Sequence, residues 1–307
     1  MAGINTTLAN VYVETYESIV RHLAQQQIAR ARPWVMEKSV QSAGHNWERL
    51  AKSTAIEKTA VGGPTNGGSS TVPTPENETV FSRRRSAPGT WHIGDVTETE
   101  DIAQVLIDPN SNIAQSQSYA MSRAIDAEIF NAAERDADDG NGGTPIPYDV
   151  NQEIGDGTAS ITFDTITEVT EKFMDNDIDP DIPKVAIISP AQARKLLQLT
   201  EATSGDYNAV RPLTSKGYIE SWMGYTWVVS TQLNLGTAAG SSLGAGTVNC
   251  LFMTRKAIGL QMNKDVWVRV AQDPSISFAW RIYCQATYGG VRVEDEHLVK
   301  VALSETI

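Results

Sequence analysis

The sequence predicts an α+β protein, and three observations support this prediction. An alanine-rich segment with helical spacing covers residues 108–136. A block over 164–231 alternates helix and strand patterns, and the chain from 249 onward shows mostly the period-two alternation of strands. The 307 residues suffice for one large or two ordinary domains with a proper core.

The chain is strongly acidic, with 25 Lys and Arg against 37 Asp and Glu and a formal net charge of −12. A charge of this sign repels phosphate backbones, which argues against a dedicated DNA-binding protein. Cys250 and Cys284 belong to no CxxC motif or Cys/His cluster. They are expected to be two buried thiols, with a disulfide as the alternative. No apolar run is as long as a membrane span and no signal peptide is present, so a soluble, cytoplasmic product is expected.

Residues 8–30 are predicted to form an amphipathic helix that ends before Pro33 and Trp34. Four apolar side chains fall at i, i+4, i+7 and i+11 and form one stripe: Tyr12, Tyr16, Ile19 and Leu23. An isolated helix has no core of its own, so this stripe must dock on another surface, for which a second subunit is a candidate.

Residues 45–100 are predicted to form a long extended hairpin. The arms NWERLAKSTAIEKTAV and TVFSRRRSAPGTWHIGDVTE are about equal in length and flank a tract over 61–79 rich in Gly, Pro, Ser and Thr. A hairpin with so little apolar content cannot bury enough surface to hold itself, so we expect it to lie on a neighbour.

The returning arm contains three consecutive arginines, Arg83, Arg84 and Arg85. A nucleic-acid handle would need a positive field over a whole face, which a chain of charge −12 does not supply. A solvated loop charge remains an alternative. We favour an anchor onto acidic side chains of a neighbouring copy, because these arginines lie on an arm that needs a partner.

The long helix and the α/β block follow from local signals. Asp108-Pro109 supplies an N-cap and a proline at the first helical position, and Met121, Ile125 and Ile129 share one face. A helix is expected over 164–176, with a capping box formed by Thr165 and Glu168 and one apolar face that consists of Ile166, Val169, Phe173 and Met174. A buried strand over 184–189 follows, and Ser189-Pro190 opens another helix. The last element of the block is a strand over 223–231 with Tyr225 and Trp227 on one face.

Catalytic, cofactor and metal motifs are not found. The Gly-rich tracts lack the lysine and the strand-to-helix context of a phosphate loop, and the four histidines have no metal-ligand spacing. DNDIDPDIP, residues 175–183, fails as an EF-hand because Pro180 and Ala186 replace the required Gly and Glu. The acidic run before His297 is expected to be a turn between strands, with a carboxylate–His hydrolase around Glu296 and His297 as the rival interpretation.

Four segments carry a family resemblance: RRRSAPGTWHIGDVTETEDIAQVLIDPNSNIAQSQSYAMSRAIDAEIFNA, KVAIISPAQARKLLQ, GYIESWMGYTWVVSTQL, and the closing pair MTRKAIGLQMNKDVWVRV and YGGVRVEDEHLVKVAL. In this order they resemble the major capsid protein of tailed bacteriophages, with the Hong Kong ninety-seven-type fold. The resemblance covers nearly the whole chain. It implies an N-terminal arm over 1–44, an E-loop hairpin over 45–100, the spine helix of a peripheral domain over 101–142, an axial α/β domain over 143–248, and C-terminal strands over 249–307 that complete both domains.

The resemblance also implies a non-enzymatic structural protein, found in the virion capsid and assembled in the host cytoplasm. Its copies would form hexamers and pentamers of an icosahedral shell around packaged double-stranded DNA. The implied partners are other copies of the chain, a portal, a decoration protein and, because the N-terminal region is short, a separate scaffolding protein. A tail-tube or decoration protein is the alternative. Eight residues are expected at subunit interfaces: Arg83, Arg84, Arg85, Trp34, Trp47, Trp91, Tyr12 and Tyr16.

Overall fold

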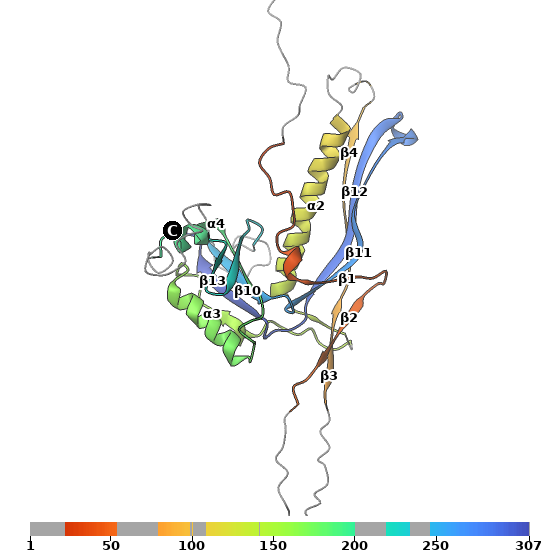
Figure 1. The fold of residues 1–307 in the computed structure, drawn as a ribbon. Helices are drawn as coiled ribbons and strands as arrows, with labels where there is room; N and C mark the ends of the chain where they lie inside the picture. Colours follow the sequence, from red (N-terminus) through yellow and green to blue (C-terminus); the bar gives the residue numbers. More distant parts are fainter. Residues whose placement is uncertain are drawn as a thin grey trace, which may run out of the picture. The chain divides into compact units, whose positions relative to one another are not determined.

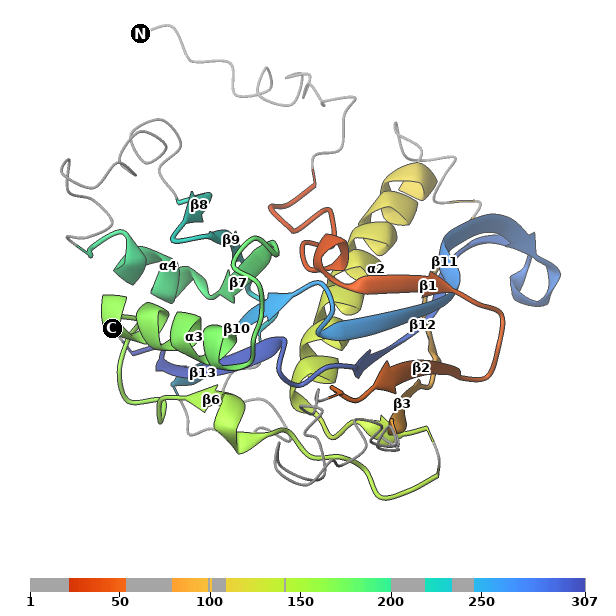
Figure 2. The same cartoon turned by 60° about the horizontal axis from the view of Figure 1, so that its bottom comes forward.

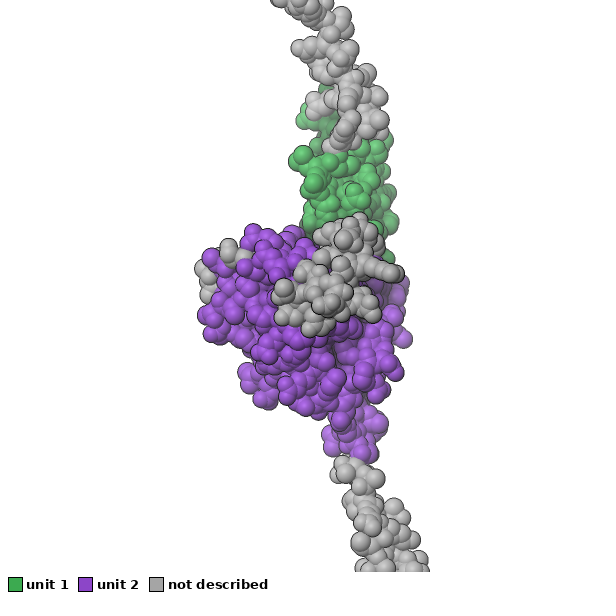
Figure 3. All heavy atoms as spheres, turned by 60° about the vertical axis from the view of Figure 1, so that its left-hand side comes forward, with its two compact units in different colours: residues 1–28, 90–123, 265–286 green, residues 29–89, 124–264, 287–307 purple. Residues whose placement is uncertain are grey.

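The structure is a computed structural model that describes residues 22–53, 79–98, 100, 109–140, 142–199, 219–233 and 246–306. The chain divides into two compact units (Figure 3). Unit 1 comprises residues 1–28, 90–123 and 265–286, and unit 2 comprises residues 29–89, 124–264 and 287–307. Tyr12, Tyr16, Asp108 and nearly all of the Gly-rich tract over 61–79 lie outside the described residues. The expectations for them therefore stay predictions.

A six-stranded mixed sheet forms the larger core of unit 2. Its strands run in the order β6 (Glu153–Ile154), β13 (Leu298–Ser304), β10 (Thr247–Thr254), β7 (Lys184–Ile188), β9 (Tyr225–Val229) and β8 (Ser221–Trp222). The central strand β7 is buried along its whole length, parallel to β9 and antiparallel to β10. The predicted buried strand and the β-rich end of the chain are confirmed.

Two helices lie against this sheet, α3 (Phe163–Asp175) and α4 (Pro190–Leu196) (Figures 1 and 2). Ser189 caps α4 as expected, since its hydroxyl accepts from the backbone N–H of Gln192. The cap of α3 is Thr162, whose hydroxyl accepts from the N–H of Thr165, so the capping box expected from Thr165 and Glu168 is wrong. Met174 was expected on the apolar face but is 58% exposed.

Aromatic side chains fill the space between α3 and the sheet. The ring of Phe252 lies edge-on to those of Tyr225 and Trp227, with ring centroids 5.4 and 5.8 Å apart. The Tyr225 hydroxyl lies 3.1 Å from Thr170 of α3. Cys250 and Cys284 are both buried and free, as expected, and burial raises the pKa of the Cys250 thiol to about 12.

Helix α2 (Pro109–Glu134) is the long helix expected from the sequence, and Met121, Ile125 and Ile129 on it are at most 1% exposed. Residues 22–30 are not helical, which corrects the expected N-terminal helix over that part. This segment instead forms hydrogen bonds with side chains of α2. In unit 1 Arg123 of α2 donates to the side chain of Gln25 over 2.9 Å. In unit 2 the N–H groups of Arg30 and Ala31 donate to Asp126 of α2 over 2.8 and 3.0 Å. None of the described helices is long and apolar enough to cross a membrane.

A four-stranded sheet has the order β1 (Met36–Ser39), β11 (Ile258–Asp273), β12 (Ala279–Arg292) and β4 (Gly89–Thr97). β11 begins fully buried and becomes alternately exposed beyond Met262. β4 belongs to the predicted hairpin segment but pairs with β12, so the returning arm changes sheets after Ala87 and Pro88.

That change of sheet depends on a glycine. A Cβ at Gly289 would lie 2.8 Å from the carbonyl carbon of Ala87 and 2.9 Å from the Cα of Pro88, which are backbone atoms that cannot rotate away. We expect Gly289→Ala to lower the free energy of unfolding by about 1–3 kcal/mol, measured by urea denaturation of unassembled subunits. Gly94→Ala is the control, because its Cβ would meet nothing closer than 3.9 Å. Equal stability of the two variants would contradict the close approach.

Candidate subunit-interface site

The three arginines lie on the hairpin strand β3 (Phe81–Ser86), which pairs antiparallel with β2 (His45–Leu50) (Figure 1). This pairing confirms the predicted hairpin at its base. The short strand β5 (Asp138–Asp139) pairs with the other edge of β3. Successive side chains of a strand point to opposite faces, so Arg84 lies on one face and Arg83 and Arg85 on the other.

Arg84 is only 2% exposed and binds within its own chain. Its Nη2 donates to Oδ2 of Asp295 over 2.7 Å, and Oδ1 of the same carboxylate accepts from Nε of Arg292 over 2.5 Å. We call Arg84, Arg292 and Asp295 the arginine cluster. Arg84 therefore already has a carboxylate partner in its own chain, and its expected role at a subunit interface stays a prediction.

Arg292 holds the loop that follows α2. Its side chain is fully buried, and its Nη1 donates to the carbonyl of Arg135 over 2.7 Å. Its Nη2 donates to the carbonyls of Ile146 and Pro147 over 3.1 and 2.9 Å. The planar guanidinium satisfies several backbone acceptors at once, which a lysine could not do.

The guanidinium of Arg84 has fewer hydrogen-bond partners than that of Arg292. Its Nε and Nη1 atoms are buried without a hydrogen-bond partner in the described structure. Burial lowers the pKa of the Arg84 guanidinium, and the attraction of Asp295 offsets that effect only in part. Asp295 is therefore the carboxylate that makes burial of this cation tolerable.

The opposite side of the hairpin base is exposed, and we call Leu50, Phe81, Arg83 and Arg85 its docking face. Leu50 and Phe81 are directly opposed across the strands and are 61% and 71% exposed. Nε of Arg83 lies 2.9 Å from Oε1 of Glu48. The side chain of Arg85 makes no hydrogen bond or ion pair with another described residue. Leu50 and Phe81 were not among the predicted interface residues, although their alternation with the inward-facing residues was a usable signal.

The predicted tryptophans differ in their surroundings. Nε1 of Trp47 donates to the Ser86 hydroxyl over 3.2 Å, and its ring packs on Val291 and Val293 of the same chain. Trp47 is therefore held in its own subunit, whereas Trp34 is half-buried and Trp91 is 49% exposed.

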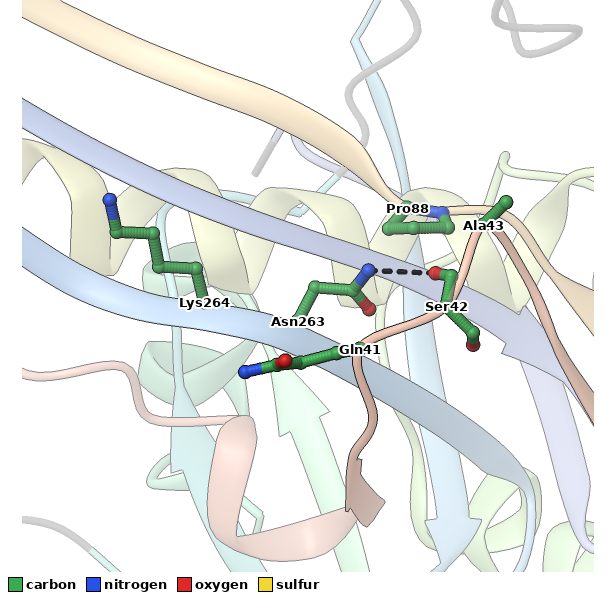
Figure 4. A pocket seen from close by; sticks show the side chains of 6 residues that line it. All are labelled: Gln41, Ser42, Ala43, Pro88, Asn263 and Lys264. Atoms are coloured by element: carbon green, nitrogen blue, oxygen red, sulfur yellow. Dashed lines mark hydrogen bonds between the residues drawn. The ribbon is translucent and has the colours of Figure 1, made fainter.

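A cavity of about 700 Å³ opens beside the hairpin base (Figure 4). It is lined by Gln41, Ser42, Ala43, Pro88, Asn263 and Lys264. Nδ2 of Asn263 donates to the carbonyl of Ser42 over 2.7 Å, which fixes the turn between β1 and β2. The lining contains no histidine, cysteine or carboxylate, so it offers no acid–base pair for catalysis.

His297 lies in the expected turn between β12 and β13. Its Nδ1 is 2.8 Å from the Thr254 hydroxyl and its Nε2 is 3.1 Å from Oε2 of Glu294. Thr254 is fully buried, so its hydroxyl cannot meet a substrate, and Glu296 pairs with Arg49 instead of His297. These bonds hold the turn in place.

Within the described ranges, no group of three or more His, Cys, Asp or Glu side chains could hold a metal ion.

Comparison with solved structures shows the same fold in phage capsids. The capsid protein of Helicobacter pylori bacteriophage KHP30 aligns with a TM-score of 0.72 at 9% identity, over 99% of this chain and 98% of that one. The capsid of cyanophage P-SCSP1u gives 0.71 at 14% identity, over 99% and 97%. The mature capsid of bacteriophage PhiM1 gives 0.68 at 14% identity, over 96% and 93%.

No curated protein matches the sequence. The sequence model of the family described as "Phage capsid protein" matches residues 8–305, which is nearly the whole chain. The mixed α+β architecture agrees with that match along its full length. The chain therefore belongs to the phage capsid protein family, and it is a major capsid protein with the Hong Kong ninety-seven-type fold, a structural subunit of the head shell.

Proposed function

We propose that copies of this chain assemble, as hexamers and pentamers, into a closed icosahedral shell that encloses the packaged double-stranded DNA of a tailed phage. The observation that supports this most directly is the docking face, because Leu50 and Phe81 expose large apolar side chains on a strand pair with little core of its own. Such a surface gains stability when another copy covers it.

Each part of the chain would have its own role in the shell. The hairpin and the N-terminal arm reach neighbouring subunits, with Arg83, Arg85, Trp34, Trp91, Tyr12 and Tyr16 as contact residues. α2 is the spine of the peripheral domain. The six-stranded sheet, which includes the C-terminal strands β10 and β13, forms the axial domain together with α3 and α4. Obligate interfaces of this kind bury on the order of 2,000–5,000 Å².

The other partners follow from the resemblance and from charge. A separate scaffolding protein, a portal and a decoration protein complete the particle, which is assembled in the cytoplasm of the bacterial host. A net charge of −12 limits adhesion of the genome to the shell while DNA is packaged. The function needs no catalytic step.

Electron microscopy of the purified protein, with and without a co-expressed scaffolding protein, tests this proposal. Closed shells are the expected result. Tubes would indicate a tail component instead, and discrete small particles under both conditions would contradict a shell-forming function.

A further inference from the structure

We propose that the docking face of one copy binds the exposed acidic face of α3 in a second copy. This inference rests on the proposed shell-forming function, because α3 of one copy can meet the hairpin of another only where copies of the chain associate. The partner is thus a defined surface of the same protein.

The hairpin side of this interface has two kinds of group. Leu50 and Phe81 form an exposed apolar pair at one end of the docking face, and Arg83 and Arg85 follow along β3. Arg83 has a partly exposed ion pair with Glu48, and the side chain of Arg85 has no bonded partner among the residues described. A surface of this composition fits a partner that offers both carboxylates and apolar contact.

The outer face of α3 offers that composition. Its buried face consists of Ile166, Val169 and Phe173. Four exposed carboxylates lie at i, i+4, i+7 and i+11, on the opposite side: Asp164, Glu168, Glu171 and Asp175. None of these side chains is hydrogen-bonded or ion-paired to any other described residue. Like charges at this spacing disfavour the helix, so a cationic partner would relieve repulsion that the isolated chain retains.

The docking face and the outer face of α3 also match in the spacing of their charges and in their apolar content. Two residues along a strand place Arg83 and Arg85 about 7 Å apart on one face. Carboxylates four residues apart on a helix are separated by about 6 Å along its axis. Met174, 58% exposed beside Glu171 and Asp175, offers an apolar contact for Phe81 or Leu50.

Charge exchange between the two faces tests the pairing. Arg83→Glu with Arg85→Glu is expected to reduce the yield of shells at least about 10-fold, counted by electron microscopy and sedimentation. Glu168→Arg with Glu171→Arg is expected to cause the same loss, and the four substitutions together are expected to restore at least half of the wild-type yield. Arg269→Glu, which reverses an exposed arginine of β11, serves as the control and is expected to assemble normally.

Two other kinds of result would contradict the pairing or the shell-forming function. Normal assembly of the arginine variant, or no recovery when all four changes are combined, overturns the pairing with α3. Wild-type protein that forms no shells under any condition contradicts the proposed function and, with it, this inference. The two failures are therefore distinguishable.

Disulfide trapping gives a second readout that does not depend on particle yield. A chain carrying Arg85→Cys and Glu171→Cys is expected to form reducible, covalently linked oligomers when shells are oxidised. The native cysteines are buried and do not compete. A chain with Arg269→Cys and Glu171→Cys is the control. Absence of linked oligomers, or an equal amount in the control, would overturn the proposal.

Discussion

Replacing Asp295 with alanine is expected to lower the free energy of unfolding by about 3–5 kcal/mol. The carboxylate is the shared acceptor of Arg84 and Arg292, whose side chains are 3% and 0% exposed. Without it, two buried guanidinium groups remain close together without the carboxylate that both of them bind, and Arg84 already has two nitrogen atoms unsatisfied.

Urea denaturation of unassembled subunits measures this loss, with the neighbouring carboxylate as a matched control. Glu296 pairs with Arg49 over 3.4 Å, and its side chain is 49% exposed, so Glu296→Ala is expected to cost about 1 kcal/mol or less. A similar small loss for both variants would show that Asp295 does not neutralise the arginine cluster.

Phe252→Ala is expected to lower the free energy of unfolding by about 3–5 kcal/mol. The side chain is fully buried in β10, and the two rings that meet it edge-on, Tyr225 and Trp227, cannot fill the space that would be left. The cost therefore includes the lost apolar burial and the remaining cavity.

The matched control is Phe278→Ala, which removes the same side chain from a site where it is 61% exposed. We expect a change within about 0.5 kcal/mol for that variant. Comparable losses at Phe252 and Phe278 would contradict the assignment of the six-stranded sheet as the main core.

Local signals in the sequence were sufficient for most of the regular elements. The proline start and the i, i+4, i+8 pattern predicted α2, and the apolar run KVAII predicted β7. Residues 22–30 departed from their helical pattern because they form hydrogen bonds with α2. Asp126 accepts from the N–H of Arg30, and Arg123 donates to the side chain of Gln25. A pattern of apolar spacing contains no information about such tertiary bonds.

The candidate site was predictable only in part. The sequence marked the arginines and the need for a hairpin, but it could not show which arginine faces inward. That depends on the register of β2 with β3 and on a carboxylate 211 residues away. An aspartate in an acidic turn looks like ordinary surface charge until the fold places it between two buried arginines.

The separation between Arg84 and Asp295 also has a consequence for the timing of synthesis. A ribosome that adds about 5–20 residues per second needs roughly 10–40 s to make the 211 residues between them. During that interval Arg84 lacks the carboxylate that it binds in the finished fold, so this contact cannot yet hold β3 in place. A copy still being translated thus lacks a finished docking face, and translation itself delays the moment at which neighbouring chains can join.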